Sequence, residues 1–127
     1  MISSLYLAAA ALLVVALLLR VAQLRHRLRV GMGDGGHGQL QRAIRVHANA
    51  VETLPMALLM LLAAEWLGAA PWLLHVAGLS LLLGRVLHAI GLGRHGGYSV
   101  GRFWGTAVTV LCYLWLIALL LYRSLLV

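Results

Sequence analysis

The stretch that decides the fold of this chain is residues 40–67, LQRAIRVHANAVETLPMALLMLLAAEWL. Its second half is almost continuously apolar, whereas its first half carries a group of polar side chains that includes Arg42, Arg45, Asn49 and Glu52. A helix needs roughly 20 mostly apolar residues to cross a bilayer, and this stretch is long enough. Charged groups inside such a helix are costly and usually mark function.

Three further apolar stretches surround it, at residues 3–24, 72–92 and 103–125. The chain has 127 residues and is 63% hydrophobic, well above the roughly 45–50% of soluble domains. Lipid leaves a spanning backbone two solutions, helices or a closed barrel, and runs this long and rich in Leu and Ala indicate helices. We therefore predict an all-α membrane protein, a single four-transmembrane-helix bundle that covers residues 1–127.

The positive charge is distributed unevenly. The formal charge of +7 comes from ten arginines against three acids. Six arginines flank the first connection: Arg20, Arg25, Arg27, Arg29, Arg42 and Arg45. Arg94 and Arg102 flank the third connection, whereas the second has no basic residue. The positive-inside rule then places connections one and three in the cytoplasm and both termini outside. Because the charge follows the topology, we expect no nucleic-acid partner.

Two other readings of the sequence are disfavoured. The first span has no positive side chain before it and several after it, which is opposite to a cleaved signal peptide, so we expect an inserted helix. Cys112 is the one cysteine and lies within the fourth span, so neither an intrachain disulfide nor a metal site is expected.

The polar residues of the second span form one face of a helix. At 100° per residue, Arg42, Arg45, Asn49 and Glu52 fall within a sector of about 80°. In the third span Arg85 and His88 share a face because they are three residues apart. At ~1.5 Å per residue, Glu52 and Arg85 both lie roughly 10 Å inside the cytoplasmic boundary, so we expect that they can meet. Glu65 and His75 are assigned no functional role.

The inner half of the membrane then holds more cations than acids. Arg42, Arg45, Arg85 and Arg102 face one carboxylate there, that of Glu52. Guanidinium groups suit carboxylate or phosphate, so the excess predicts an anionic ligand. Asn49 and Glu52 would bind an amide or amino group, which fits a molecule with carboxylates, an amine and peptide amides. Polar residues also join helices to one another, and the residues themselves leave both interpretations open.

These motifs resemble a known family. Residues 42–55, RAIRVHANAVETLP, resemble the second-helix signature of the membrane-associated proteins in eicosanoid and glutathione metabolism, the MAPEG family. Residues 84–88, GRVLH, are similar to its third-helix motif, and Arg102 followed by Gly105 and Thr106 is similar to the start of its fourth helix. Residues 29–35, RVGMGDG, resemble the bacterial branch, so we expect a bacterial cytoplasmic membrane protein.

The resemblance implies a homotrimer that binds glutathione as a co-substrate between subunits near the cytoplasmic side. It implies that Arg45, Asn49 and Glu52 hold the tripeptide and that Arg85 and His88 line the site. It makes Arg102 the candidate catalytic residue, because a guanidinium stabilises the thiolate that acts as nucleophile. Two further arginines are added to the binding residues by the same resemblance, Arg42 and Arg25.

Two positions depart from the family pattern. Leu92 stands where characterised eicosanoid enzymes have a tyrosine, and Ala48 stands where an arginine often precedes the signature asparagine. The resemblance therefore supports glutathione binding more strongly than any eicosanoid substrate. We expect a glutathione transferase or peroxidase acting on hydrophobic electrophiles or lipid hydroperoxides in the membrane. The alternatives are a non-catalytic, lipid-binding scaffold and, third, a small oligomeric transporter built around Glu52.

Overall fold

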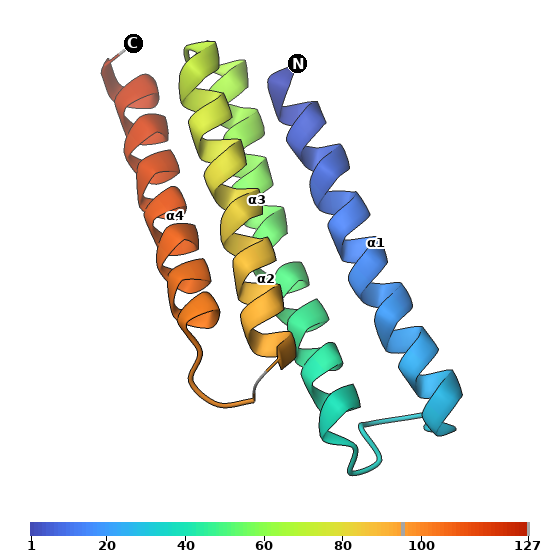
Figure 1. The fold of residues 1–127 in the computed structure, drawn as a ribbon. Coiled ribbons are helices and arrows are strands. Elements are labelled where there is room, and N and C mark those ends of the chain that lie inside the picture. The colour runs from blue at the N-terminus through green and yellow to red at the C-terminus, as the bar shows by residue number, and fades with distance from the viewer. Residues whose placement is uncertain (95, 127) are drawn as a thin grey trace.

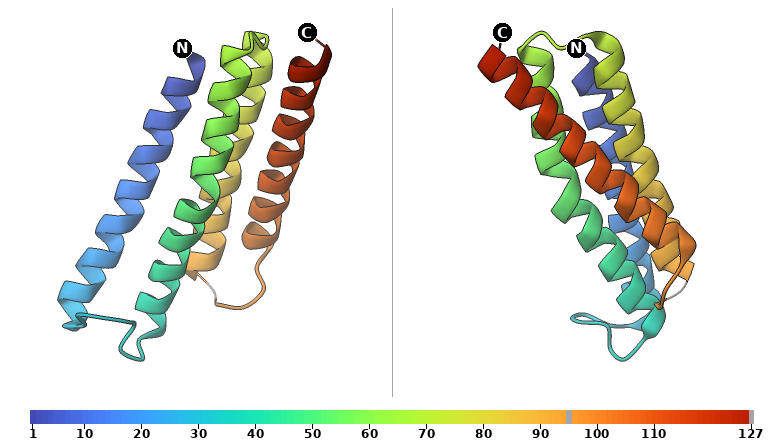
Figure 2. Two further views of the ribbon diagram at one scale, coloured as in Figure 1. Left: turned by 180° about the vertical axis from the view of Figure 1, so that it is seen from behind. Right: turned by 90° about the vertical axis from the view of Figure 1, so that its left-hand side faces the viewer.

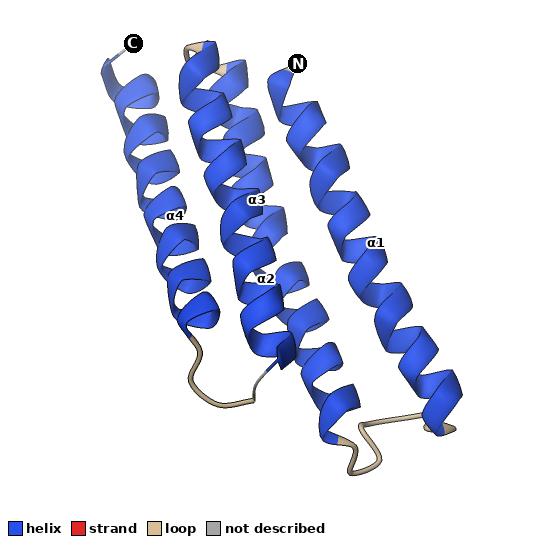
Figure 3. Cartoon of the chain, in the orientation of Figure 1, coloured by secondary structure: helices blue, strands red, loops and turns tan. Residues whose placement is uncertain are grey.

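Four long helices make up the protein. The computed structural model describes residues 1–94 and 96–126, and in this part of the chain it shows helices joined by loops and no strand (Figure 3). The helices are α1 (Ile2–Leu28), α2 (Gly38–Trp66), α3 (Pro71–Arg94) and α4 (Val100–Leu126) (Figure 1). Each is long and apolar enough to cross a membrane. Their ends differ from the predicted spans by at most four residues, the largest difference being Leu28 against residue 24. The all-α, four-span prediction is confirmed.

The central pair of the bundle is α2 and α3. Helix α1 packs against both on one side, and α4 packs against both on the other. In the described residues α1 and α4 do not touch each other, and Figures 1 and 2 show them at opposite sides of the central pair. One chain by itself is therefore an open arrangement, in which each helix leaves part of its surface uncovered.

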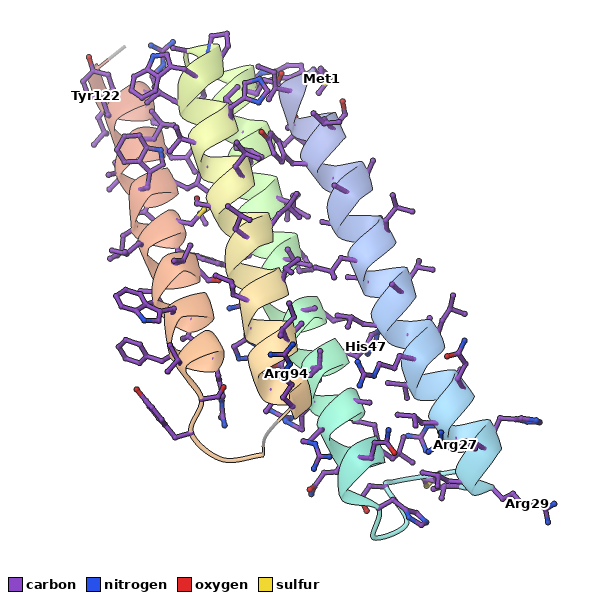
Figure 4. The ribbon with its side chains drawn as sticks, viewed as in Figure 1. Met1, Arg27, Arg29, His47, Arg94 and Tyr122 are labelled. Atoms are coloured by element: carbon purple, nitrogen blue, oxygen red, sulfur yellow. The ribbon has the colours of Figure 1, made fainter. Side chains whose placement is uncertain are left out.

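The two ends of the bundle differ in what they carry. Both termini and the short turn between α2 and α3 lie at one end, here named the termini end (Figure 1). The α1–α2 connection, residues 29–37 or loop 1, and the α3–α4 connection lie at the other, the loop end. Figure 4 shows Arg27, Arg29 and Arg94 at the loop end, and Met1 and Tyr122 at the termini end.

Glycines bring α3 and α4 very close together. A Cβ atom placed on Gly105 would lie 2.5 Å from the backbone nitrogen of His88 and 2.6 Å from the carbonyl oxygen of Gly84. A Cβ placed on Gly84 would lie 2.8 Å from Oγ1 of Thr109. Small residues allow such backbone approach in membranes, where dispersion forces and polar contacts hold helices together. The contact places the backbone of α4 next to the polar side chains of α3.

At the termini end Glu65 holds the start of α1. Its carboxylate accepts hydrogen bonds from the backbone N–H groups of Ile2 and Ser3, the latter at 2.9 Å, and from the hydroxyl of Ser3. The first N–H groups of a helix have no partner within the helix, and a carboxylate there also opposes the helix dipole favourably. Glu65, for which the sequence suggested no role, therefore links α1 to the end of α2.

Two more polar contacts complete this end. The hydroxyl of Tyr6 lies 2.7 Å from Nδ1 of His75, and the Tyr6 ring packs over Gly78. Arg123 donates from Nη2 to the carbonyl oxygens of Leu67 at 2.6 Å and of Gly68 at 2.9 Å. The carbonyl groups at the end of α2, which no helical N–H can reach, thereby gain a partner from α4.

Candidate functional site

The polar face predicted on α2 is largely uncovered. Arg45 and Glu52 are exposed, and Arg42 and Asn49 are half-buried. The Asn49 side chain donates to the carbonyl oxygen of Arg45 at 3.0 Å, one turn back along the helix. Within one chain this face therefore points outward, and its charged side chains do not contribute to the packed core.

Arg85 is buried and held by its own chain. Its side chain is 4% exposed. Nε donates to Oγ1 of Thr109 at 2.9 Å, Nη1 to Oγ1 of Thr53 at 3.3 Å, and Nη2 to the carbonyl oxygen of Gly105 at 3.1 Å. The partners are two hydroxyl groups and a carbonyl, and the expected contact with Glu52 is not among them. A guanidinium with five donors can join three partners in this way, and it ties α3 to α2 and α4.

A small cleft opens beside this guanidinium. It has a volume of about 220 Å³ and lies between α2, α3 and α4. We name it the Arg85 cleft; its lining residues are Asn49, Thr53, Arg85, Thr106, Thr109, Val110, Tyr113 and Leu114. Of the residues predicted for the site, the cleft unites Asn49 and Arg85. The cleft thus combines one fixed positive charge and several hydroxyl and amide groups with an otherwise apolar lining.

Tyr113 is the site residue that the sequence reasoning missed. Its hydroxyl donates to the carbonyl oxygen of Thr53 at 2.5 Å, across from α4 to α2. The residue could have been found from spacing, since Thr106, Thr109 and Tyr113 follow Arg102 at helical intervals and extend its face along α4. Leu92, one of the two positions that depart from the family pattern noted in the sequence, is buried. The phenol next to Arg85 therefore comes from α4.

The remaining predicted residues lie apart from this cleft. His88 is 5% exposed and sits where Gly105 of α4 meets α3. Arg102 is exposed at the start of α4. Arg25 donates from Nη1 to the carbonyl oxygen of Gly33 at 2.8 Å, so it orders loop 1. Nε of Arg42 is buried and has no hydrogen-bond partner in the described part of the chain. One chain therefore does not gather the predicted residues into one pocket.

The side chains that commonly bind metal ions are not clustered in the described residues. Among residues 1–94 and 96–126 the structure brings together no group of three or more His, Cys, Asp or Glu side chains that would hold a metal ion. The buried thiol of Cys112 donates to the carbonyl oxygen of Ala77 at 3.3 Å and so takes part in the α3–α4 packing.

Comparison with known proteins identifies the family. The model of the MAPEG family matches residues 3–122, nearly the whole chain. The chain belongs to the MAPEG family. It is 45% identical over 91 residues to inner membrane protein YecN of Escherichia coli strain K12, a match that covers 72% of this chain and 70% of that protein. The YecN protein of Escherichia coli O6:H1 strain CFT073 matches equally well.

Membership of the MAPEG family confirms the resemblance drawn from residues 42–55. Four membrane-length helices and a relative named an inner membrane protein support a multi-pass protein of the bacterial inner membrane. In this MAPEG chain the residues of the second-helix motif occupy an open face of α2, next to the Arg85 cleft but mostly outside it.

Proposed function

We propose that this protein is a glutathione-dependent enzyme of the bacterial inner membrane, with its loop end in the cytoplasm and both termini outside. It acts as a transferase or peroxidase on hydrophobic electrophiles or lipid hydroperoxides dissolved in the bilayer. The observation that carries the proposal is the outward-facing polar face of α2, formed by Arg42, Arg45, Asn49 and Glu52 and here named the stripe. Arg45 and Glu52 are exposed on it, and Asn49 also lines the Arg85 cleft.

The stripe and glutathione are chemically complementary. Glutathione carries two carboxylates, one amino group and two peptide amides. Arg45 and Arg42 are free to take the carboxylates, and the buried Nε of Arg42 has no acceptor among the described residues. Glu52 suits the amino group, and Asn49 suits a peptide amide. Arg85 is fixed by its own hydrogen bonds, so it contributes a preorganised positive charge at the wall of the site.

The exposure of the stripe also supports assembly into a homotrimer. Arg45 and Glu52 do not line the Arg85 cleft, and α1 and α4 of one chain stay apart across the described residues. A second copy packed against α2 would cover the stripe and complete the site with its own side chains. Exposed charges at membrane depth are costly, and such packing would remove that cost.

The proposed reaction needs one activated sulfur atom. Arg102, exposed at the start of α4, stabilises the glutathione thiolate and so raises the fraction of glutathione that can attack. In transfer, the thiolate forms a carbon–sulfur bond with the electrophile, and the leaving group departs with its electron pair. The Arg102→Ala variant should keep the oligomer and lose turnover, as measured with a chromogenic aryl halide; unchanged turnover would remove this role from Arg102.

The proposal is tested by calorimetric titration of glutathione into the purified protein in detergent. Saturable binding is expected for the wild type and for Arg27→Ala, which removes an exposed arginine of α1 outside the stripe. The double variant Arg45→Ala/Glu52→Ala should lose binding, because it removes the partners of a carboxylate and of the amino group. Absence of binding to a folded, oligomeric wild type would overturn the proposal.

A second candidate function is a non-catalytic scaffold that binds lipid. An apolar groove of about 720 Å³ between α1 and α2 favours it, as does Leu92 at the tyrosine position. Turnover separates the two functions: a scaffold would bind lipid without consuming glutathione in the presence of electrophile or hydroperoxide.

A further inference from the structure

A second, smaller cleft lies between α1, α2 and α3 towards the loop end. Its volume is about 210 Å³, and it shares no lining residue with the Arg85 cleft. One lining residue is charged, Arg20, and the others are apolar, among them Leu13, Leu17, Val86, Ile90 and Gly93. An apolar cleft with a single guanidinium matches an amphipathic anion, which has an acyl chain and a negatively charged head.

The position of Arg20 favours an anionic partner. Arg20 precedes the end of α1 at Leu28 by eight residues, which is roughly 12 Å along the axis. Helix α1 contains no Asp or Glu, and in the described residues the Arg20 side chain makes no hydrogen bond to the rest of the chain. A cation inside a span must reach water or an anion, and the phosphate of a lipid is an anion within reach of a snorkelling arginine.

The shape of the cleft agrees with the orientation of a bilayer lipid. Leu17 and Leu13 precede Arg20 on α1, so they lie about one and two turns deeper in the membrane. A phosphate held by Arg20 would face the loop end, and the chain below it would run along these leucines towards the bilayer centre. Val86 and Ile90 of α3 form the opposite wall of the cleft.

We propose that this cleft is a binding site for an anionic phospholipid of the leaflet at the loop end, with the phosphate at Arg20 and part of one acyl chain in the cleft. The site is independent of glutathione, because it lies on another face of α2 and α3. A free fatty acid shares the same chemistry, a carboxylate on an acyl chain, and is distinguished from the phospholipid by the test.

The first test is native mass spectrometry of the wild-type protein in detergent, titrated with phosphatidylglycerol or with phosphatidylcholine of the same chains. Phosphatidylglycerol should bind more tightly. Arg20→Gln should weaken it roughly five-fold, the effect of one arginine on an anionic lipid. Arg27→Gln is the matched control, since it removes an exposed arginine of the same helix that does not line the cleft, and it should bind as the wild type does.

A second variant tests the cleft without touching the charge. A Cβ placed on Gly93 would meet nothing within 4 Å, so Gly93→Leu adds a side chain to open space in the cleft. Leucine also favours the helix over glycine, so the variant should fold. The variant keeps Arg20, but its leucine side chain fills the space of the acyl chain. It should therefore bind phosphatidylglycerol more weakly than the wild type does.

Several results would overturn the proposal. Equal affinity of the wild type for the two lipids would show that the site does not recognise the charge of the headgroup. Equal losses of phosphatidylglycerol affinity in Arg20→Gln and Arg27→Gln would show a nonspecific effect of surface charge. If Gly93→Leu binds phosphatidylglycerol as tightly as the wild type does, the cleft is not the binding site of the acyl chain. Displacement of phosphatidylglycerol by equimolar oleate would assign the site to fatty acids instead. Unchanged glutathione titration in Arg20→Gln is expected and separates this site from the proposed function.

Discussion

The termini end and the loop end of the bundle differ in how their polar side chains are satisfied. At the termini end Glu65 binds the start of α1, Tyr6 meets His75, and Arg123 binds the carbonyl groups that end α2. At the loop end Arg45 and Arg102 are exposed, and the buried Nε of Arg42 has no partner in the described chain. Within loop 1 some polar groups are paired as well, such as Arg25 with Gly33, but the charged groups of Arg45 and Arg102 have no side-chain hydrogen bond in the described residues.

This difference separates structural from functional polar residues. A buried polar group that bonds to its own chain contributes to stability, whereas one left without a partner carries a cost that a ligand or another subunit removes. Arg85 refines this division. It belongs by sequence to the basic set of the loop end, yet it is held by Thr53, Thr109 and Gly105 as firmly as the residues of the termini end. We therefore expect it to stabilise the fold as well as the site.

The largest effect is expected where α3 and α4 meet. Gly105→Leu would drive a side chain into the backbone of His88 and Gly84 and would move the carbonyl oxygen that Arg85 uses. Overpacking costs about 1–3 kcal/mol and more when backbone must move. The variant should unfold at a much lower temperature in detergent, measured by circular dichroism. Gly97→Ala, where a Cβ meets nothing within 4 Å, is the control; equal melting of the two variants would contradict the close contact.

A smaller loss is expected for Arg85→Ala. It leaves two hydroxyl groups and a carbonyl oxygen without their shared donor, at about 1–3 kcal/mol. Arg85→Lys keeps the charge, but an ammonium does not have the planar fork that reaches three partners, so it should restore stability only in part. Melting in detergent without glutathione measures both. If Arg85→Ala melts as the wild type does, Arg85 belongs with the unsatisfied residues of the loop end.

At the termini end Glu65→Ala should release the start of α1. The first N–H groups of α1 would lose their acceptor, and α1 has no contact with α4 in the described chain to replace it. We expect a lower melting temperature and faster hydrogen exchange at the amides of residues 2–5. Asp34→Ala, which removes an acceptor within loop 1, should leave these amides unchanged. Unaltered exchange in Glu65→Ala would show that α1 is held by apolar packing.

In this fold the sequence predicts the position of a residue along its helix better than it predicts which residue of another helix it contacts. Apolar runs locate the four helices. The rise per residue predicts Glu52 and Arg85 at a similar level of the bundle, and Arg85 does reach Thr53, the residue that follows Glu52. The rotation of each helix about its own axis depends on packing. Here α3 and α4 meet at their glycines, and Arg85 faces Thr109, 24 residues away in the sequence. Glu65 was missed for the same reason, since its partner Ser3 is 62 residues away. Such distant pairs are decided by how the helices assemble.

The smallest effect on stability, and the sharpest test of the comparison, comes from a matched pair of arginines. Arg123→Ala removes donors to the carbonyl oxygens of Leu67 and Gly68 at the termini end, so it should lower the melting temperature. Arg45→Ala removes an exposed side chain at the loop end, and without glutathione its effect should stay within about 0.5 kcal/mol. The order should reverse for glutathione titration, because Arg45 is then the residue with a partner to lose. Arg45→Ala could instead destabilise the protein as much as Arg123→Ala does and separate its subunits. In that case the stripe on α2 joins helices of neighbouring copies, and groups of those copies are the partners of the arginines at the loop end.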